Sequence, residues 1–254
     1  MERSRWTCMK KAERFRNEWK YLVNYAELAL LRQRLAVLLQ PDKHSIDGGY
    51  SIRSLYFDDY WNTAYNEKDA GVLTRRKWRI RIYNASDSVI HLERKKKYGS
   101  YIFKESASLT REQTDRILDG DYAFLLAHPD QLCREFYVEC TSRALSPRVI
   151  VDYEREAWVQ DEGTVRITFD TDVRAGILHT DLFDSSLPTL SALPPGKAVL
   201  EVKFTEFLPQ AVREALPPSS AEFTAVSKFV LCCDKTRYLH GFESYFETEG
   251  ERYQ

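Results

Sequence analysis

Hydrophobic and polar residues alternate over much of this chain, a pattern typical of β-strands with one buried face. Eight segments show the pattern, and short turn-like stretches separate most of them. The segments are residues 14–23, 50–59, 76–84, 88–97, 101–109, 148–159, 165–173 and 198–207. Strands joined by short turns predict an antiparallel sheet or a closed barrel.

Helical periodicity appears between these segments. It is clearest in residues 25–40, which Pro41 ends, and residues 109–121 have near their start a threonine, Thr110, that can cap a helix. Residues 130–143 are also predicted to be helical, and prolines bound a short helix at 208–218. Helices packed around an antiparallel sheet would give an α+β fold.

One face of most predicted strands is charged. The stretch RRKWRIRIYN, residues 75–84, has a cation at every second position, so a strand here has one cationic and one apolar face. The four cations are Arg75, Lys77, Arg79 and Arg81, and Trp78, Ile80 and Ile82 lie between them. The charged faces predicted for the other strands carry Arg16, Glu18, Lys20, His91, Glu93, Lys95, Arg148, Asp152, Glu154, Arg166, Thr168, Asp170, Asp172, Glu201, Lys203 and Thr205.

Two arrangements fit these charged faces. In the first, a half-buried sheet turns its charged face to solvent. In the second, a closed barrel turns the charged faces into a shared lumen, which would need a bound anion to neutralise its cations. Phosphate suits that role because arginine binds its oxygens bidentately and lysine acts as a mobile point charge. Such a lumen would select a long, thin and highly charged ligand.

Charge and composition narrow the classes of function. The formal net charge is −1, from 37 basic and 38 acidic residues, which argues against a protein that coats nucleic acid. The five cysteines form no CxxC pair and the five histidines show no HExxH spacing, so free thiols and no zinc site are expected. Because no long apolar run or signal-like segment occurs, we predict a cytoplasmic protein without a membrane span.

The lumen model also offers sites for a divalent metal. Glu201 and Glu18 are the best candidates, with Glu93 as a further one, since Mg²⁺ and Mn²⁺ prefer carboxylate and phosphate oxygens. The chain has no Walker A motif and no GxGxxG motif, so side chains rather than a backbone loop would hold a nucleotide.

Nine short segments resemble, in this order, the blocks of the VTC domain. These are FRNEWKYLV, SLYFDD, RKWRIRIY, HLERKKK, YIFKES, RVIVDYER, VRITFDTDV, AVLEVKF and AVSKFVLC, which span roughly residues 14–238. The VTC domain is the polyphosphate polymerase branch of the triphosphate tunnel metalloenzyme, or CYTH-like, superfamily. The resemblance implies one domain over residues 1–254, with an eight-stranded antiparallel β-barrel as its tunnel and helices packed around it.

The resemblance also implies roles for individual residues. The catalytic phosphate ligands would be Lys20, Arg79, Arg81 and Lys203. Further phosphate and nucleotide ligands would be Lys95, Lys104, Arg148, Arg166 and Lys228, and Glu201 would bind Mn²⁺ or Mg²⁺. Tyr56, Phe57 and Asp58 are predicted to support the fold rather than the chemistry.

One position departs from the superfamily pattern. Its hydrolase and cyclase branches begin with ExExK, whereas this chain has RNEWK, with Arg16 at the first acidic position. The missing carboxylate favours a single metal and phosphate-on-phosphate transfer over a water-activating metal pair.

The resulting prediction is a polyphosphate polymerase that moves the γ-phosphate of ATP onto inorganic polyphosphate. We expect ATP and polyphosphate as partners, no nucleic acid, and a membrane partner protein of unknown identity at most. Two alternatives stay open: a tunnel triphosphatase that gives the phosphate to water, and a non-catalytic module that binds polyphosphate or nucleotide.

Overall fold

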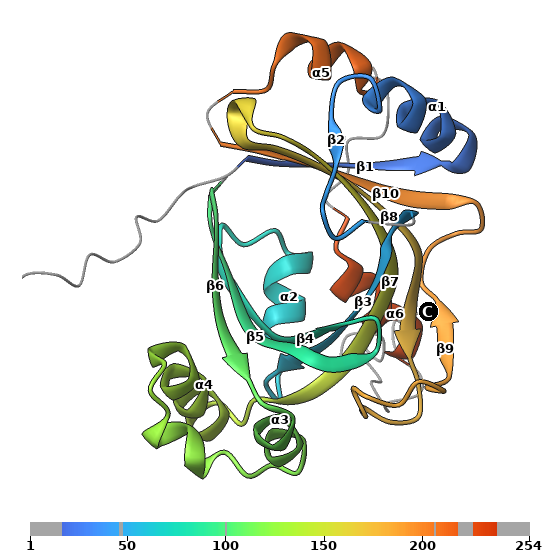
Figure 1. The fold of residues 1–254 in the computed structure, drawn as a ribbon. Coiled ribbons are helices and arrows are strands. Elements are labelled where there is room, and N and C mark those ends of the chain that lie inside the picture. Colours follow the sequence, from blue (N-terminus) through green and yellow to red (C-terminus); the bar gives the residue numbers. More distant parts are fainter. Residues whose placement is uncertain (1–16, 46–47, 100, 206, 218–225, 238–254) are drawn as a thin grey trace, which may run out of the picture.

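Within the residues that the computed structural model describes, ten strands form one strongly curved antiparallel sheet (Figure 1). The described residues are 17–45, 48–99, 101–205, 207–217 and 226–237. The strands are β1 (Asn17–Asn24), β2 (Gln40–Pro41), β3 (Tyr50–Asp58), β4 (Thr74–Tyr83), β5 (Ser86–Tyr98), β6 (Tyr101–Leu109), β7 (Ser146–Gln160), β8 (Val165–Gly176), β9 (Thr189–Ser191) and β10 (Lys197–Phe204).

The strand order is β1-β10-β8-β7-β3-β4-β5-β6, with β2 beside β7 and β9 beside β8. All eight predicted strands are confirmed, but the closed eight-stranded barrel is wrong, because the sheet has ten strands and its path is open between β1 and β6. The two extra strands have two and three residues, too few to show alternation in the sequence.

Side chains connect the two edges of the sheet. Figure 1 shows the sheet curling until β6 approaches the start of β1. Across this gap Lys95 of β5 forms an ion pair with Glu18 of β1, at 2.9 Å between Nζ and Oε2. The sheet therefore encloses a lumen without closing its backbone hydrogen-bond ladder.

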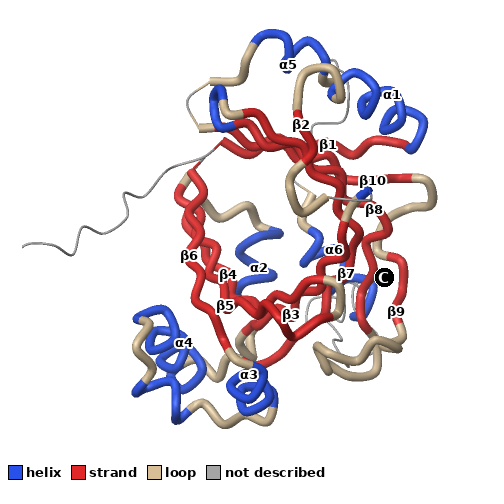
Figure 2. The backbone as a smooth tube through the Cα atoms, in the orientation of Figure 1, coloured by secondary structure: helices blue, strands red, loops and turns tan. Residues whose placement is uncertain are grey.

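The helices predicted from periodicity lie on the convex side of the sheet. They are α1 (Tyr25–Leu35), α3 (Arg111–Leu118), α4 (Gln131–Ser142) and α5 (Gln210–Ala215). α1 and α5 lie over β1 and β10, and α3 and α4 lie beside β4, β5 and β6 (Figures 1 and 2). Hydrophobic cores fill the space between these helices and the outward residues of the strands. Thr110 caps α3, as predicted, because its side chain accepts a hydrogen bond from Gln113 N.

Two further helices, which the periodicity does not predict, lie on the concave side. They are α2 (Thr63–Asp69) and α6 (Lys228–Thr236), which Figures 1 and 2 show inside the curve of the sheet. Tyr65 of α2 donates a hydrogen bond to Asp234 of α6, at 2.6 Å. Phe229 of α6 packs with inward residues of β3 and β7 in a third core. Part of the concave space is thus filled by helix rather than open.

The RRKWRIRIYN stretch forms β4 with the predicted division of faces. Trp78, Ile80 and Ile82 are buried in the outer core, next to α4 and α3. Arg79 and Arg81 point to the concave side, where they contact Glu93 of β5. No helix in the described segments is long and apolar enough to cross a membrane.

Candidate functional site

The concave face carries a network of charged side chains centred on Glu201. Its Oε1 lies 3.2 Å from Lys20 Nζ and 2.9 Å from Lys228 Nζ. Its Oε2 lies 2.8 Å from Lys203 Nζ and 3.5 Å from a guanidinium nitrogen of Arg155. β1, β7, β10 and the first residue of α6 therefore place four cations around one carboxylate.

Two more carboxylates extend this network. Asp170 of β8 is fully buried, forms a bidentate pair with Arg155 at 2.6 and 2.7 Å, and contacts Lys228. Glu18 of β1 contacts Lys20 at 3.1 Å and Lys95 at 2.9 Å. Five cations thus surround three carboxylates in this part of the lumen.

A second group of charges surrounds Glu93 of β5. Its carboxylate contacts Arg79 at 2.6 Å, Lys104 at 2.8 Å and Arg81 at 3.8 Å. Arg79 also donates to the hydroxyl of Tyr56 at 2.7 Å. Here three cations share one carboxylate, whose side chain is 1% exposed.

Burial and the surrounding cations shift the pKa values of these carboxylates in opposite directions. Burial acts to raise the pKa of Glu201, but Lys20, Lys203 and Lys228 outweigh it and hold that pKa well below its usual range. Burial likewise acts to raise the pKa of Glu93, and Arg79 and neighbouring cations lower it instead. These carboxylates are therefore ionised at neutral pH.

The cations still outnumber the carboxylates in both groups. Positive charge held in a partly desolvated space is costly unless an anion compensates it. Burial lowers the pKa of Lys95 to about 8 and also lowers the pKa of Lys203. The network is thus an incomplete set of ion pairs that a polyanion would complete.

Most of the predicted site residues meet in this network. The structure brings together Lys20, Arg79, Arg81, Lys95, Lys104, Lys203, Lys228 and Glu201, with Glu18 and Glu93 among them. Arg166 lies on the same face of the sheet but contacts Asp42 and the hydroxyl of Tyr50. Arg16 lies outside the described residues, so its substitution in the RNEWK motif stays a prediction.

The predicted inward face of β7 is wrong by one residue. Asp152 pairs with Arg53 at 2.8 Å, and Arg53 also donates to backbone oxygens at 182 and 184, away from the Glu201 network. The inward residues are Tyr153 and Arg155. Arg148 is half-buried at a register shift between β3 and β7, where burial lowers its pKa although Cys233 and Asp58 act to raise it.

The β7 error has a local cause. The inward face of β7 carries Val149, Val151, Tyr153 and Arg155, and its first three members pack in the third core with Phe229 of α6. A residue pattern alone does not show that a helix fills part of the concave side, so this largely apolar face is assigned to the outside. Arg155 is present in the DYER motif, on the face that the pattern assigns to the outside. Asp170 stands on the predicted charged face without an assigned role, and Tyr56 is assigned only to the fold.

Glu201, Thr168 and Asp170 are the residues that could hold a divalent metal. Glu201 lies directly opposite Thr168 in the ladder of β10 and β8, and Asp170 follows two residues later on the same face. The hydroxyl of Thr168 is fully buried and has no hydrogen-bond partner among the described residues. Carboxylate and hydroxyl oxygens are ligands that Mg²⁺ and Mn²⁺ accept.

This donor set is too small to hold a metal by itself. Within the described ranges no three His, Cys, Asp or Glu side chains form a metal-binding group. Mg²⁺ commonly takes one or two carboxylates and completes its coordination with water and substrate phosphates. A metal here would therefore bind together with a phosphate ligand.

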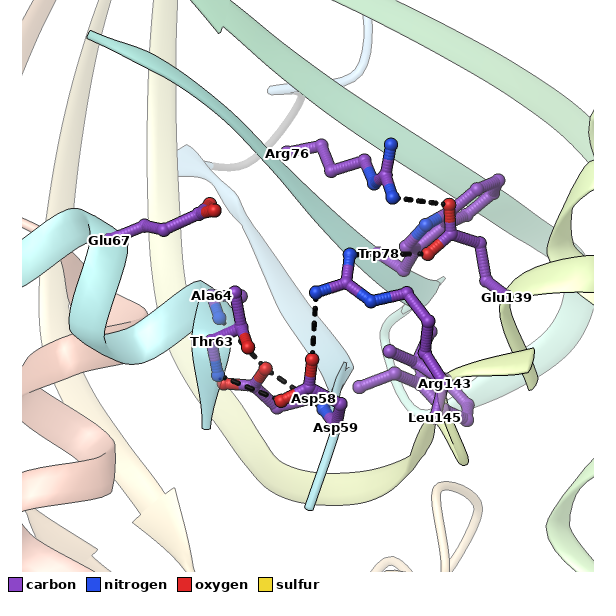
Figure 3. A pocket seen from close by; sticks show the side chains of 11 residues that line it. Asp58, Asp59, Thr63, Ala64, Glu67, Arg76, Trp78, Glu139, Arg143 and Leu145 are labelled. Atoms are coloured by element: carbon purple, nitrogen blue, oxygen red, sulfur yellow. Dashed lines mark hydrogen bonds and ion pairs between the residues drawn. The ribbon is translucent and has the colours of Figure 1, made fainter. Parts of the chain in front are cut away.

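The structure has two cavities of note. One, of about 340 Å³, is lined by Arg32 of α1 and by residues of β7 and β8 that include Glu156 and Phe169, so it lies on the outer side of the sheet. A smaller one, of about 20 Å³, lies where β3 meets α2 and α4 (Figure 3). In the smaller cavity Asp59 pairs with Arg143 at 2.9 Å and also anchors α2, so this cavity is a structural junction.

A family model matches most of the chain. Residues 15–237 match the VTC domain. No curated protein matches the chain.

Three solved structures are similar at low sequence identity. The PH1819 protein of Pyrococcus horikoshii has a TM-score of 0.46 and 13% identity, covering 87% of this chain and 99% of its own. A candidate adenylate cyclase of Bacillus halodurans has a TM-score of 0.45 and 12% identity, with coverages of 80% and 86%. Another candidate adenylate cyclase, of Vibrio parahaemolyticus, has a TM-score of 0.42 and 11% identity, with coverages of 80% and 82%.

Proposed function

Because the chain belongs to the VTC domain family, we propose that it is a polyphosphate polymerase that transfers the γ-phosphate of ATP onto inorganic polyphosphate. The observation that carries the proposal is the excess of cations over carboxylates in the Glu201 and Glu93 groups. A triphosphate would bring the missing negative charge. Arginine and lysine would donate hydrogen bonds to its oxygens. Such charge-assisted hydrogen bonds are stronger than hydrogen bonds to neutral acceptors.

The proposed reaction joins two phosphates. A terminal oxygen of polyphosphate attacks the γ-phosphorus of ATP in line, and the bond from that phosphorus to the β-phosphate oxygen breaks. ADP leaves with the bonding electrons, and polyphosphate gains one unit, so no water and no covalent enzyme intermediate takes part. Catalysis of this kind consists of positioning and of stabilising charge on the transferred group.

The chain's own residues would carry out both tasks. We assign Lys20, Lys203, Arg79 and Arg81 to the reacting phosphates, and Arg155 joins them from β7. Glu201, with Thr168 and Asp170 nearby, would hold Mn²⁺ or Mg²⁺. When bound, the metal would neutralise charge on phosphate oxygens.

We also propose which cation lies nearest the nucleoside of ATP. Arg166 lies opposite Lys203 in the ladder of β8 and β10, on the same face of the sheet, and contacts the hydroxyl of Tyr50. It would hold the phosphate nearest the ribose, and the triphosphate would extend from Arg166 toward Glu201 and Glu93.

The test is to incubate purified chain with ATP and Mn²⁺ and to separate the products by size. We expect ADP and long-chain polyphosphate, and loss of both with Glu201→Gln, which keeps the size of the side chain but removes its charge. ADP with free phosphate and no polymer would contradict the proposal and favour a triphosphatase. Binding of ATP without any turnover would favour a non-catalytic module.

A further inference from the structure

The small cavity where β3 meets α2 and α4 is lined by two residues that each have a buried polar atom without a hydrogen-bond partner among the described residues. The two atoms are the indole Nε1 of Trp78, on β4, and Oε2 of Glu139, on α4. Trp78 is 2% exposed, so bulk water does not reach its N–H group. Buried donors and acceptors nearly always have a partner, either in the protein or in an ordered water molecule.

Two other carboxylates of this cavity are already engaged. Asp58 accepts the backbone N–H groups of residues 59, 64 and 65. Asp59 accepts the backbone N–H of Thr63, the first residue of α2, and pairs with Arg143 at 2.9 Å. These two side chains therefore hold the start of α2, and Oε2 of Glu139 stays available to a further ligand.

The carboxylate of Glu139 lies between two guanidinium groups (Figure 3). Its Oε1 forms an ion pair with Arg76 of β4 at 2.8 Å, whereas its Oε2 lies 3.7 Å from Nη1 of Arg143. The second distance is too long for a hydrogen bond, and polar groups at such a separation are commonly bridged by water. Trp78 and Arg143 thus supply two donors, and Glu139 supplies one acceptor.

The size and the chemistry of the cavity define its ligand. Its volume of about 20 Å³ has room for one water molecule, which needs at least about 10–15 Å³. The ligand must accept a hydrogen bond from indole, which only donates, and must donate one to a carboxylate, which only accepts. A metal ion or an ammonium ion cannot accept the first bond, and a halide ion cannot donate the second. Water can do both.

We propose that this cavity binds one ordered water molecule, which accepts hydrogen bonds from Trp78 Nε1 and Arg143 Nη1 and donates one to Glu139 Oε2. Three hydrogen bonds are the usual number for a buried water molecule in a protein. The site is independent of the proposed function, because its three residues belong to β4, α4 and the end of α4 and none of them is in the Glu201 or Glu93 group.

The water connects elements on the two sides of the sheet. Trp78 lies in the outer core, whereas Arg143 contacts Asp59 and, through it, the first residue of α2 inside the curve. By holding the guanidinium group of Arg143, the water supports this ion pair and the start of α2.

The test is solution NMR of the isotope-labelled full chain, measuring magnetisation transfer from water to the indole N–H protons. A buried, long-lived water molecule gives a cross-peak of opposite sign to that of surface water. We expect this cross-peak at Trp78, whose signal is identified by its loss in Trp78→Phe. Trp158 is the matched control indole, since its Nε1 donates directly to Glu156 Oε1 at 3.0 Å, and it should show no such cross-peak.

Three variants separate the proposed contacts. Glu139→Leu removes the acceptor and should abolish the cross-peak at Trp78. Arg76→Met is its matched control, because it breaks the ion pair at Oε1 but leaves Oε2 in place, and the cross-peak should remain. Thr63 also lines the cavity, and Thr63→Val excludes transfer relayed by its hydroxyl proton, so the cross-peak should again remain. In Glu139→Leu the backbone N–H groups of residues 64 and 65 should exchange about tenfold faster, since a hydrogen bond to a charged group is lost.

Three results would overturn the inference. They are the absence of the cross-peak at Trp78 in the original protein, its loss in Thr63→Val, and its persistence at full strength in folded Glu139→Leu. The measurement on the original protein decides the proposal even where Glu139→Leu fails to fold. Unchanged exchange at residues 64 and 65 in folded Glu139→Leu would refute the support of α2.

Discussion

At the scale of single residues, Glu201 and its neighbours determine what the lumen can bind. Four cations form ion pairs with this one carboxylate, so these ion pairs, and not water, stabilise its negative charge. The hydroxyl of Thr168, directly opposite in the ladder, is buried and unpartnered among the described residues. A buried polar group without a partner destabilises a fold, and where it persists beside a candidate metal ligand it suggests a role in binding.

Thr168→Val tests that role, because valine has nearly the same shape and no hydroxyl. Removing an unpartnered buried hydroxyl should stabilise the ligand-free protein, by about 1 kcal/mol. If the hydroxyl contributes to metal binding, Mn²⁺ affinity measured by titration in the presence of tripolyphosphate should fall.

Thr114→Val is the control for this prediction. The hydroxyl of Thr114 is also buried, but it donates to the backbone oxygen of Thr110 at 2.9 Å. This variant should lose stability in urea unfolding and leave Mn²⁺ affinity unchanged. A loss of stability in Thr168→Val would show that its hydroxyl is already satisfied in the folded protein.

Lys95 makes the lumen sensitive to pH. Burial lowers its pKa to about 8; Glu18 and Glu201 act to raise it, and Lys20 and Lys203 act to lower it. As pH rises through about 8, the folded protein loses this positive charge, so affinity for tripolyphosphate should fall. The Lys95→Arg variant keeps its charge over this range, and its affinity should stay constant.

The lowered pKa of Lys95 also determines whether the free energy of unfolding rises or falls with pH. Between pH 8 and the ordinary lysine value of 10.5, the unfolded chain holds a proton that the folded chain has released at Lys95. The contribution of Lys95 therefore makes the folded state more stable as pH rises across this window. A fall in affinity of equal size in Lys95→Arg and in the original protein would assign the pH dependence to another group.

At the scale of elements, α6 connects the charged network to the hydrophobic interior of the curve. Its first residue, Lys228, contacts Glu201 and Asp170, and the next residue, Phe229, packs against Tyr56 at 4.9 Å between ring centres. Tyr56 in turn accepts a hydrogen bond from Arg79. The helix thus contacts the Glu201 group directly through Lys228 and supports Arg79 of the Glu93 group through the pair of Phe229 and Tyr56.

Phe229→Ala should remove the ring contact by which α6 supports Tyr56. Phenylalanine to alanine changes in a core cost about 3–5 kcal/mol, and Phe229 is 2% exposed. We expect a loss of that size in urea unfolding, together with weaker binding of a non-hydrolysable ATP analogue, because Lys228 and Arg79 lose their support. The exposed Lys235, on the same helix, should tolerate alanine with little change in stability. A stable Phe229→Ala with normal binding would mean that α6 does not position the network.

At the scale of the whole molecule, the sheet encloses its lumen by curving strongly and not by closing into a barrel. The outer cores between the sheet and α1, α5, α3 and α4 bend the sheet around a charged interior. The ion pair between Lys95 and Glu18 then spans the open edges. Because the edges are linked by side chains, the width of the lumen depends on charges that also belong to the candidate site.

The sequence by itself determined the strands, the outer helices and the cationic faces. These features are local, since alternation with a period of two and helical periodicity appear within a single segment. For that reason the alternating pattern and the ordered motifs together suffice to place Arg79, Arg81, Lys20 and Lys203 in a shared lumen. The ordered motifs also indicate the family, which the family model confirms.

Only the tertiary structure decided how the segments meet. The inward face of β7 that carries Arg155, the open path between β1 and β6, and the placement of α2 and α6 inside the curve all depend on contacts between distant segments. The structure also separated the cations paired with carboxylates from those that are not, such as Lys77 among the described residues. A pattern along the chain shows that a residue is charged, but the balance of charge in a lumen depends on which strands face one another.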